Sequence, residues 1–506
     1  MGETGWFAYT PLTDVAGYAH GNGNSSNAEV NGRFEAADVG RLARRGMRSV
    51  VKAARADLAP TVTKELLDHL GPVPGDVAVV AETWAAYELV NVQAGLDAWL
   101  AEPGRAHRSF APVSMHWRDF RLGDLLSATG DMATVRPGNV ATVNLPCGPD
   151  GEVMPCASRA IHLVTEPDGE RLALLVLGPE RHERNEVGVQ AVSTVPGLAA
   201  AATARIRELA RERNVFRGHV LTFGGDFFDS GVSVLQFHRR PTLDRTGLVL
   251  PDGVLDSVER QVLGVGRHRA ALLASGQHLK RGLLLYGPPG TGKTHTIRYL
   301  LSRAADTTVI QLTGDALRMI AEACSVARAL TPSMIVVEDV DLIAEDRDSY
   351  GGRTPLLFEL LNEMDGLAED ADVVFVLTTN RADLLEPALA ARPGRVDQAV
   401  ELGLPDAAAR RALLELYRGA LRLPEDALQR MADRTDGVTA SFLKELLRRA
   451  AVVGADAGAG GDGPVTVAAE HLDEALAELM ETRNAMTRAA LGAWPPVEEL
   501  PDRGYA

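Results

Sequence analysis

The chain has 506 residues, of which 46% are hydrophobic and 24% are charged. That length is too great for one compact core and predicts about three domains of roughly 100–200 residues each. The formal net charge of −16 argues against a nucleic-acid-binding protein, because contacts to phosphate require clustered Lys and Arg.

The cysteines and the apolar runs bear on cellular location. Cys147, Cys156 and Cys324 are odd in number and form no CxxC pair, which argues against a disulfide framework or a zinc knuckle. Cys147 and Cys156 could meet across a short hairpin, but two unrelated thiols are the favoured interpretation. The N-terminus lacks the basic and apolar regions of a signal peptide, and no apolar run approaches the roughly 18–20 residues of a membrane helix. We therefore expect a cytoplasmic protein without a membrane anchor.

The first 240 residues are predicted to form a flexible start and a separate domain. Residues 1–35 are rich in Gly, Asn and Ser and are expected to be flexible. Residues 36–240 mix helix and strand patterns, including an Ala-rich helix within Pro196–Val215. A Gly/Asp turn joins two expected strands, Val220–Gly225 and Val232–Arg240. This block holds four of the five tryptophans, so we expect an N-terminal domain of mixed α/β structure that selects a partner.

The remainder changes character after a linker at residues 241–253. Within residues 254–403 short apolar strands alternate with helical patterns, which predicts a parallel sheet covered on both faces. Residues 404–485 are mostly helical, with a Gly/Ala/Asp loop at Gly454–Gly463, and residues 486–506 are expected to be an extended tail. The expected core elements, in chain order, are strand Gly282–Gly287, a helix from Lys293, strand Thr308–Gly314, helix Ala316–Leu330, strand Met334–Asp339, helix Leu356–Met364 and strand Val373–Asn380.

The strongest motif is GPPGTGKT at Gly287–Thr294, between an apolar strand and a helix pattern. It fits the phosphate loop G-x-x-x-x-G-K-[ST], whose glycines turn successive N–H groups toward phosphate at a helix N-terminus. Lys293 is expected to bridge the β- and γ-phosphates of ATP, and Thr294 to bind Mg²⁺. A Gly-rich turn that binds nothing is the alternative, and the strand–loop–helix context disfavours it. The expected nucleotide contacts are Gly287, Pro288, Pro289, Gly290, Thr291, Gly292, Lys293, Thr294 and His295.

Two acids and an amide at strand ends extend this site. Glu338 and Asp339 close an apolar strand; Glu338 is expected to bind Mg²⁺, and Asp339 to orient or deprotonate the attacking water. A solvated helix cap is the alternative for such a pair, but it is less favoured after a phosphate loop. Asn380 closes the next strand and could hydrogen-bond the same water, although Asn is also common in turns.

Arg392 and Arg395 flank a Pro-Gly turn. They could belong to a simple surface loop. Their functional interpretation is an arginine finger, which neutralises charge on a transferring phosphoryl group and is worth about 10³–10⁵ in rate. Such arginines would reach the ATP of a neighbouring subunit, so they imply a ring.

These motifs occur in the order seen in the AAA family of ATPases, which residues 251–483 resemble. LLNEMDGL at Leu360–Leu367 and the segment Thr435–Ala450 also resemble the family's core helix and helical lid. The resemblance implies an α/β P-loop NTPase core with a parallel sheet and a C-terminal helical lid. It also implies ATP and Mg²⁺ as ligands and a homo-oligomeric ring, usually a hexamer.

The chain departs from the family pattern at two places. The family usually has Asp then Glu at the second motif, whereas here Glu338 precedes Asp339, so the expected base is one methylene shorter and slower hydrolysis is expected. Threading members carry an aromatic-Gly pore loop, whereas residues 313–333 contain no aromatic residue and offer only Met319 and Ile320. On both points the core resembles the subgroup of the mitochondrial chaperone that delivers the Rieske iron–sulfur protein. That chaperone has a membrane helix, which we do not find here.

The sequence therefore predicts an ATP-hydrolysing ring that remodels or chaperones protein clients selected by its N-terminal domain. A nucleotide-controlled switch with slow hydrolysis is an alternative, prompted by the order of Glu338 and Asp339. A nucleic-acid-associated motor is another, against which the acidic charge argues. No HExxH motif occurs, so a built-in protease is not expected. The end Tyr505-Ala506 resembles the proteasome-docking tails of some AAA rings, but a plain tail is favoured because the preceding hydrophobic residue is missing.

Overall fold

The computed structural model describes residues 60–75, 77–113, 121–127, 135–180, 185–224, 234–341, 356–381, 396–424, 426–459 and 463–481. The chain divides into two units, Met1–Pro60 and Thr61–Ala506, and almost all described residues belong to the second. The predictions for residues 1–35 and for the tail at 486–506 lie outside the described residues.

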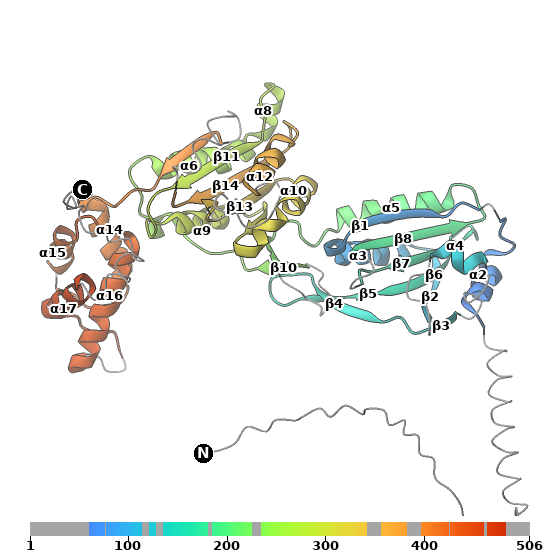
Figure 1. Ribbon diagram of the computed structural model, residues 1–506, viewed down its shortest axis with the longest axis horizontal. Coiled ribbons are helices and arrows are strands. Elements are labelled where there is room, and N and C mark those ends of the chain that lie inside the picture. The colour runs from blue at the N-terminus through green and yellow to red at the C-terminus, as the bar shows by residue number, and fades with distance from the viewer. Residues whose placement is uncertain are drawn as a thin grey trace, which may run out of the picture. The chain divides into compact units, whose positions relative to one another are not determined.

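A seven-stranded sheet forms the predicted α/β core (Figure 1). Its strand order is β10-β9-β12-β13-β14-β11-β15, and every neighbouring pair is parallel except β10 and β9. The expected strands of the core are confirmed. The strands are β9 (Val220–Gly224), β10 (Val234–His238), β11 (Arg281–Tyr286), β12 (Thr308–Leu312), β13 (Ser333–Val337), β14 (Val373–Thr379) and β15 (Gln398–Glu401).

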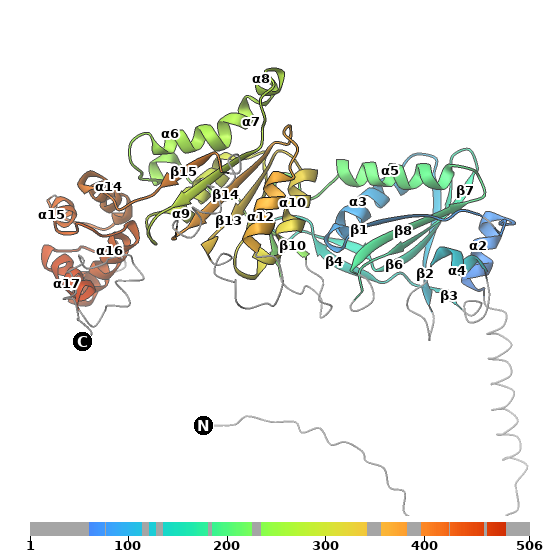
Figure 2. The same ribbon diagram turned by 45° about the horizontal axis from the view of Figure 1, so that its top comes forward.

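Helices cover both faces of this sheet, as Figure 2 shows. On one face α6 (Val254–Glu259) and α9 (Lys293–Arg303) pack against alternate strand residues such as Leu283 and Leu285. On the other face lie α10 (Ile320–Ala329) and α12 (Leu356–Asp365). Because both faces are covered, β13 and β14 are buried along their whole length, as expected for a parallel sheet.

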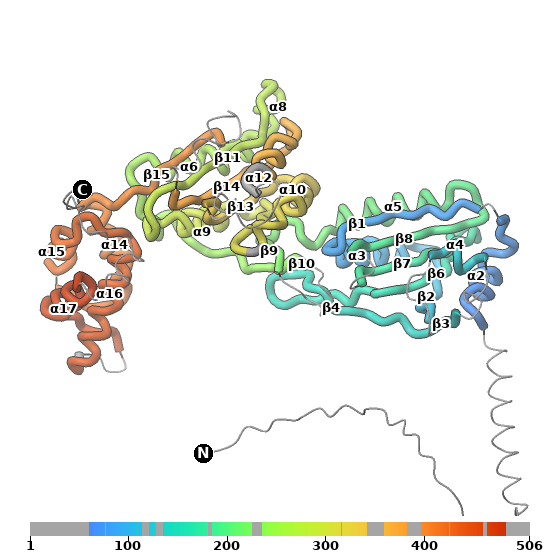
Figure 3. The backbone as a smooth tube through the Cα atoms, in the orientation of Figure 1, coloured from blue at the N-terminus to red at the C-terminus, as the bar shows by residue number. Residues whose placement is uncertain are grey.

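The two strands predicted near residues 220–240 do form, and they join the seven-stranded sheet (Figure 3). Strand β9 runs parallel to β12, and the peptide N–H of Val309 donates to the carbonyl oxygen of His219 at 2.8 Å. The sheet therefore draws two strands from the segment that we assigned to the N-terminal domain. The division of the whole chain into domains stays a prediction.

The segment interpreted as a linker lies against α9. The hydroxyl of Ser302 donates to the carbonyl oxygen of Leu243 at 2.8 Å. Further along, Leu248 forms a small buried cluster with Leu255 and with Tyr299 of α9. The linker is therefore packed along part of its length.

Four helices after residue 404 form a bundle with its own core, which confirms the predicted helical lid (Figure 1). Asp406 caps the first of them by accepting a hydrogen bond from the N–H of Ala409 at 2.8 Å. The predicted loop at Gly454–Gly463 starts later than expected, because a helical turn continues from Ala455 and breaks at Gly458, where φ is 81°. The helices are α14 (Ala407–Arg418), α15 (Ala427–Arg434), α16 (Ala440–Gly454) and α17 (Ala469–Met480).

The N-terminal part is a mixed α/β structure, as predicted. Its six-stranded antiparallel sheet has the order β1-β8-β7-β6-β2-β3, and a separate hairpin pairs β4 with β5. Helices α3 and α5 pack on one face of the sheet and α2 and α4 on the other. The elements are α2 (Val62–Leu70), β1 (Val80–Ala85), α3 (Leu89–Leu100), β2 (Ala106–Val113), α4 (Leu122–Ser127), β3 (Arg136–Gly138), β4 (Thr142–Pro146), β5 (Val153–Ala157), β6 (Arg159–Thr165), β7 (Arg171–Leu177), β8 (Glu186–Ser193) and α5 (Leu198–Glu212).

The state of the three cysteines agrees with the interpretation as unrelated thiols. Cys147, Cys156 and Cys324 are all free thiols, which confirms that the first two are not bonded across the β4–β5 hairpin. Burial raises the pKa of Cys156 and of Cys324 to about 12, so neither is a reactive thiolate near neutral pH. Within the described residues, no helix combines the length and the apolar character needed to cross a membrane.

Candidate functional site

The phosphate-loop motif connects β11 to α9 at the carboxyl edge of the parallel sheet. Three of its glycines have positive φ: Gly287 at 138°, Gly290 at 80° and Gly292 at 109°. A Cβ atom on Gly287 would lie 2.3 Å from the carbonyl oxygen of Leu402, so only glycine fits there. The glycines thus give the loop the curl that lets peptide N–H groups face an anion at the start of α9.

The side chain of Lys293 lies within this loop. Its ammonium group donates to the carbonyl oxygens of Gly287 at 2.8 Å and Pro288 at 2.9 Å, and the residue is 7% exposed. Burial lowers the pKa of Lys293, while the nearby carboxylates of Asp339 and Asp341 act in the opposite direction. A cation that is held by neutral carbonyls and faces carboxylates can bind a polyphosphate with little rearrangement.

Thr294 and Glu338 meet, as the sequence predicted. The hydroxyl of Thr294 donates to Oε2 of Glu338 at 2.7 Å, which joins the first turn of α9 to the end of β13. Hydroxyl and carboxylate oxygens are the ligands that Mg²⁺ prefers beside substrate phosphates. The donor set therefore fits the expected metal, with Thr294 and Glu338 as the residues that would hold it.

Asp339 and Asn380 also meet, across the ends of β13 and β14. The amide of Asn380 donates to Oδ1 of Asp339 at 3.3 Å. Asp339 has φ 53°, a conformation that Asp and Asn tolerate better than other non-Gly residues. Its own N–H donates to the hydroxyl of Thr378 at 3.0 Å, which holds this turn in place. A carboxylate and an amide thus face the same space beside the loop.

Asp341 also belongs to this group, although it is not among the site residues predicted from the sequence. Its Oδ1 accepts hydrogen bonds from the hydroxyl of Thr379 at 2.8 Å and from the N–H of Asn380 at 3.3 Å. Asp341 therefore fixes the end of β14 that carries Asn380. The signal in the sequence was a third acid at the same strand end, two residues beyond Asp339.

The lid approaches the loop at the N-terminus of α16. The N–H of Ser441 donates to the carbonyl oxygen of Gly290 at 3.1 Å. A Cβ on Gly290 would lie 2.9 Å from Oγ1 of Thr439, the residue that caps α16. The sequence pattern does not indicate that these residues contact a loop some 150 positions earlier. They are therefore not among the site residues predicted from the sequence.

Other predicted residues lie elsewhere or are not described. Nε2 of His295 hydrogen-bonds with the carbonyl oxygen of Gly247 at 2.9 Å, so its imidazole contacts the linker and a phosphate contact by this residue stays a prediction. Ile320 is fully buried and Met319 is packed against the same core, so neither projects like a pore residue. Arg392 and Arg395 lie outside the described residues. The phosphate loop also contains Pro288, Pro289 and Thr291. Within it, Oγ1 of Thr291 donates to the carbonyl oxygen of Pro288 at 2.9 Å.

Comparison with protein families matches residues 283–404 to the model described as ATPase family associated with various cellular activities (AAA). These residues are therefore similar to an AAA domain. They include most of β11, the phosphate loop, the acids at the end of β13, and Asn380. The rest of the chain, including the six-stranded sheet and most of the lid, falls outside the matched residues.

Three relatives show what part of the chain is similar to. One is a Cell division cycle protein 48 homolog of Archaeoglobus fulgidus, 35% identical over 34% of this chain and 25% of that protein. Another is the Proteasome-activating nucleotidase of Methanopyrus kandleri, 35% identical over 34% of this chain and 43% of that protein. A third is ATP-dependent zinc metalloprotease FtsH 2 of Sphaerobacter thermophilus, 36% identical over 40% of this chain and 32% of that protein. The matched part is thus less than half the length of each of these relatives.

Proposed function

We propose that this protein binds ATP with Mg²⁺ at the phosphate loop and hydrolyses it. The observation that carries the proposal is the occurrence of two contacts near the phosphate loop, Thr294 with Glu338 at 2.7 Å and Asn380 with Asp339 at 3.3 Å. The carboxylate of Asp339 also acts electrostatically on Lys293. A binding loop, a metal-binding pair and a candidate base with its amide partner are thereby brought together. The match of residues 283–404 to an ATPase family supports the same assignment.

Each residue has a separate task in the proposed reaction. The peptide N–H groups of the loop and the ammonium of Lys293 bind the phosphates and neutralise their negative charge. Thr294 and Glu338 would hold Mg²⁺, which would supply further positive charge to the phosphates. The carboxylate of Asp339 accepts a proton from the attacking water, whose orientation the amide of Asn380 fixes by a hydrogen bond. Asp341 positions Asn380 through the end of β14.

The broader role that we propose is remodelling of protein clients by a homo-oligomeric ring, with a hexamer as the expected form. The similarity to a proteasome-activating nucleotidase and to a cell-division-cycle protein 48 homolog supports a protein-directed ATPase. Arg392 and Arg395 are proposed to reach the ATP of the neighbouring subunit. The N-terminal domain is proposed to select the client. A C-terminal tail without a docking role and a cytoplasmic location remain predictions.

One observation favours a second candidate, a nucleotide-controlled switch with slow hydrolysis. Asp339 is one methylene shorter than the glutamate usual in the family, and its backbone conformation at φ 53° is one that favours Asp or Asn over Glu. The same order of acids and the core-packed Met319 and Ile320 support our proposed relation to the Rieske-protein chaperone subgroup. A switch would bind ATP and assemble but turn over slowly.

The experiment that separates these roles measures binding, assembly and turnover on one preparation. A fluorescent ATP analogue with Mg²⁺ reports affinity, sedimentation reports the ring, and phosphate release reports hydrolysis. A remodelling ATPase binds, assembles and releases phosphate, and a switch does only the first two. Failure to bind adenine nucleotide would overturn both. Lys293→Ala is the binding-defective control.

A further inference from the structure

The two edges of the six-stranded sheet differ in how they are protected. At one edge β3 has only three residues and carries Pro137, which has no N–H to offer to another strand. At the other edge β1 has six residues, VAETWA, without proline or lysine. In the antiparallel pair with β8, every second residue of β1 directs its N–H and C=O groups toward β8. The residues between them direct these groups away from β8, to the free side of β1. No strand among the described residues pairs with that outer side.

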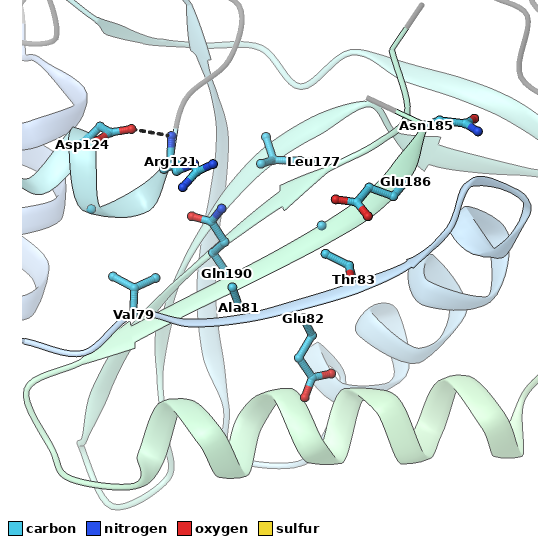
Figure 4. Close-up of a pocket in the computed structure, with 12 residues that line it drawn as sticks. Val79, Ala81, Glu82, Thr83, Arg121, Asp124, Leu177, Asn185, Glu186 and Gln190 are labelled. Carbon is cyan, nitrogen blue, oxygen red and sulfur yellow. Dashed lines mark hydrogen bonds between the residues drawn. The ribbon is translucent and has the colours of Figure 1, made fainter. Parts of the chain in front are cut away.

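A pocket of about 750 Å³ lies on the face of the sheet beside β1 (Figure 4). Ala81 and Thr83 of β1 border it and are exposed, and Gly188 of β8 leaves further room. Leu177 of β7, which is buried, contributes an apolar wall. The pocket exists because Ala81 and Thr83 follow one another on this face of β1 and Gly188 lies opposite Thr83 on β8. Helices α2 and α4 cover the neighbouring part of the same face.

Strand β1 is held firmly from the opposite face. The side chain of Glu82 points away from the pocket toward α5, as Figure 4 shows, and it pairs with Arg207 of that helix at 2.8 Å. Val80 and Trp84 pack against the core on the same side. The backbone of β1 is therefore held in an extended conformation, and its outer edge can pair with another strand without rearrangement.

We propose that an extended segment of a protein client adds to β1 as a further strand and places large apolar side chains in this pocket. This inference rests on the client-binding role proposed above for the N-terminal domain. Backbone hydrogen bonds to β1 would supply general affinity, and the pocket beside Ala81 and Thr83 would select alternate side chains. The segment also carries a basic residue that meets Glu186 at the rim.

The chemistry of the rim favours a basic client segment over a second copy of this chain. Three carboxylates border the pocket, and that of Glu82 is paired with Arg207, which leaves Glu186 and Asp124 beside the single guanidinium of Arg121. Glu186 is exposed and makes no ion pair with another described residue, whereas Asp124 accepts from the N–H of Arg121. A second β1 would bring only alanine and threonine to the pocket and would leave it unfilled. Two copies would also bring two acidic rims together, on a chain of net charge −16.

The proposal can be tested with three peptides and the full chain without nucleotide. The first alternates large apolar residues with threonine and carries a lysine at each end. The second has glutamate in place of lysine, and the third repeats the first with N-methyl groups on alternate peptide nitrogens. We expect the first to bind, the second to bind roughly tenfold more weakly because of charge, and the third to lose binding because it cannot donate to β1. Hydrogen exchange should slow in residues 80–85 when the first peptide binds.

Two variants and a matched control assign binding to this pocket. Ala81→Trp fills the pocket and Glu186→Lys reverses the charge of the rim, and both residues are exposed, so the fold should tolerate either change. We expect each to weaken the lysine peptide roughly tenfold. Ala204→Trp places the same bulk on an exposed position of α5 and should leave binding unchanged.

Several outcomes would overturn the proposal: no binding of the lysine peptide, full binding of the N-methylated peptide, or wild-type affinity of Ala81→Trp. A dimer that Ala81→Trp dissolves, with no effect of peptide, would assign the edge to a second copy instead. ATP-analogue binding, measured on the same samples, separates the two proposals. Loss of peptide binding with intact nucleotide binding contradicts only the strand-addition site, and the reverse result contradicts only the ATPase.

Discussion

Asp339→Asn is the sharpest test of the proposed chemistry, because the substitution changes charge and almost nothing else. Asn tolerates the backbone conformation at φ 53° as well as Asp does, and its side-chain oxygen can still accept from Asn380. We therefore expect a change in the free energy of unfolding within about 0.5 kcal/mol. The variant loses the carboxylate that would take the proton from water.

The expected loss of rate follows from that single change. A positioned general base contributes typically 10²–10⁴-fold, which corresponds to about 2.7–5.4 kcal/mol of activation free energy. The nucleotide contacts made by Lys293 and Thr294 are untouched, so affinity for ATP should stay within about threefold of the wild type, a difference of roughly 0.65 kcal/mol.

The assay is steady-state phosphate release at saturating ATP and Mg²⁺, with affinity measured separately by a fluorescent ATP analogue. Asp370→Asn is the matched control, because Asp370 is an exposed carboxylate before β14, at the opposite end of that strand from Asn380. It should retain the wild-type rate. A wild-type kcat for Asp339→Asn would refute the assignment of the base. A loss of ATP affinity would show instead that Asp339 shapes the binding site.

Three further substitutions test a phosphate contact, a buried ion pair and a buried histidine. Lys293→Ala removes a charge-assisted contact to phosphate and should weaken ATP binding roughly 10–100-fold, measured with the fluorescent analogue. Asp372→Ala leaves the guanidinium of Arg281 buried without its partner at 2.8 Å, so the free energy of unfolding should fall by about 3–5 kcal/mol in urea titration. Burial lowers the pKa of His162 to about 4, so folding favours its neutral form. The contribution of neutral His162 to the free energy of unfolding is therefore complete above pH 6.5 and is lost as the pH falls toward 4, by about 3 kcal/mol. His162→Met should flatten that part of the curve of stability against pH.

The sequence was most informative where one short segment determines both the local structure and the candidate chemistry. Gly287–Thr294 combines a buried strand before it, glycines with positive φ within it and a helix after it, so its structure and its candidate chemistry could be predicted together. The pairing of Thr294 with Glu338 was predictable for a related reason. Parallel strands that alternate with helices bring their carboxyl ends to one edge, and residues at those ends must be neighbours.

The sequence was least informative where residues meet through tertiary packing. Strand β9 has an ordinary strand pattern, and nothing in that pattern shows whether its partner is β10 alone or also β12. The contact of Ser441 with Gly290 depends on how the lid folds back, which periodicity does not report. Asp341 was overlooked because its partners, Thr379 and the N–H of Asn380, lie on a strand that pairs with its own only after folding.

Helix α9 shows why the loop and the linker cannot be treated as separate parts. His295, Tyr299 and Ser302 follow one another at intervals of four and three residues, so they share one face of the helix. His295 and Ser302 hydrogen-bond with carbonyl oxygens of residues 247 and 243, and Tyr299 packs against Leu248. The opposite face carries Ile297 and Leu300 into the sheet. A displacement of the first turn of α9, where Thr294 lies, must therefore move the linker as well as the sheet, because one rigid helix contacts both.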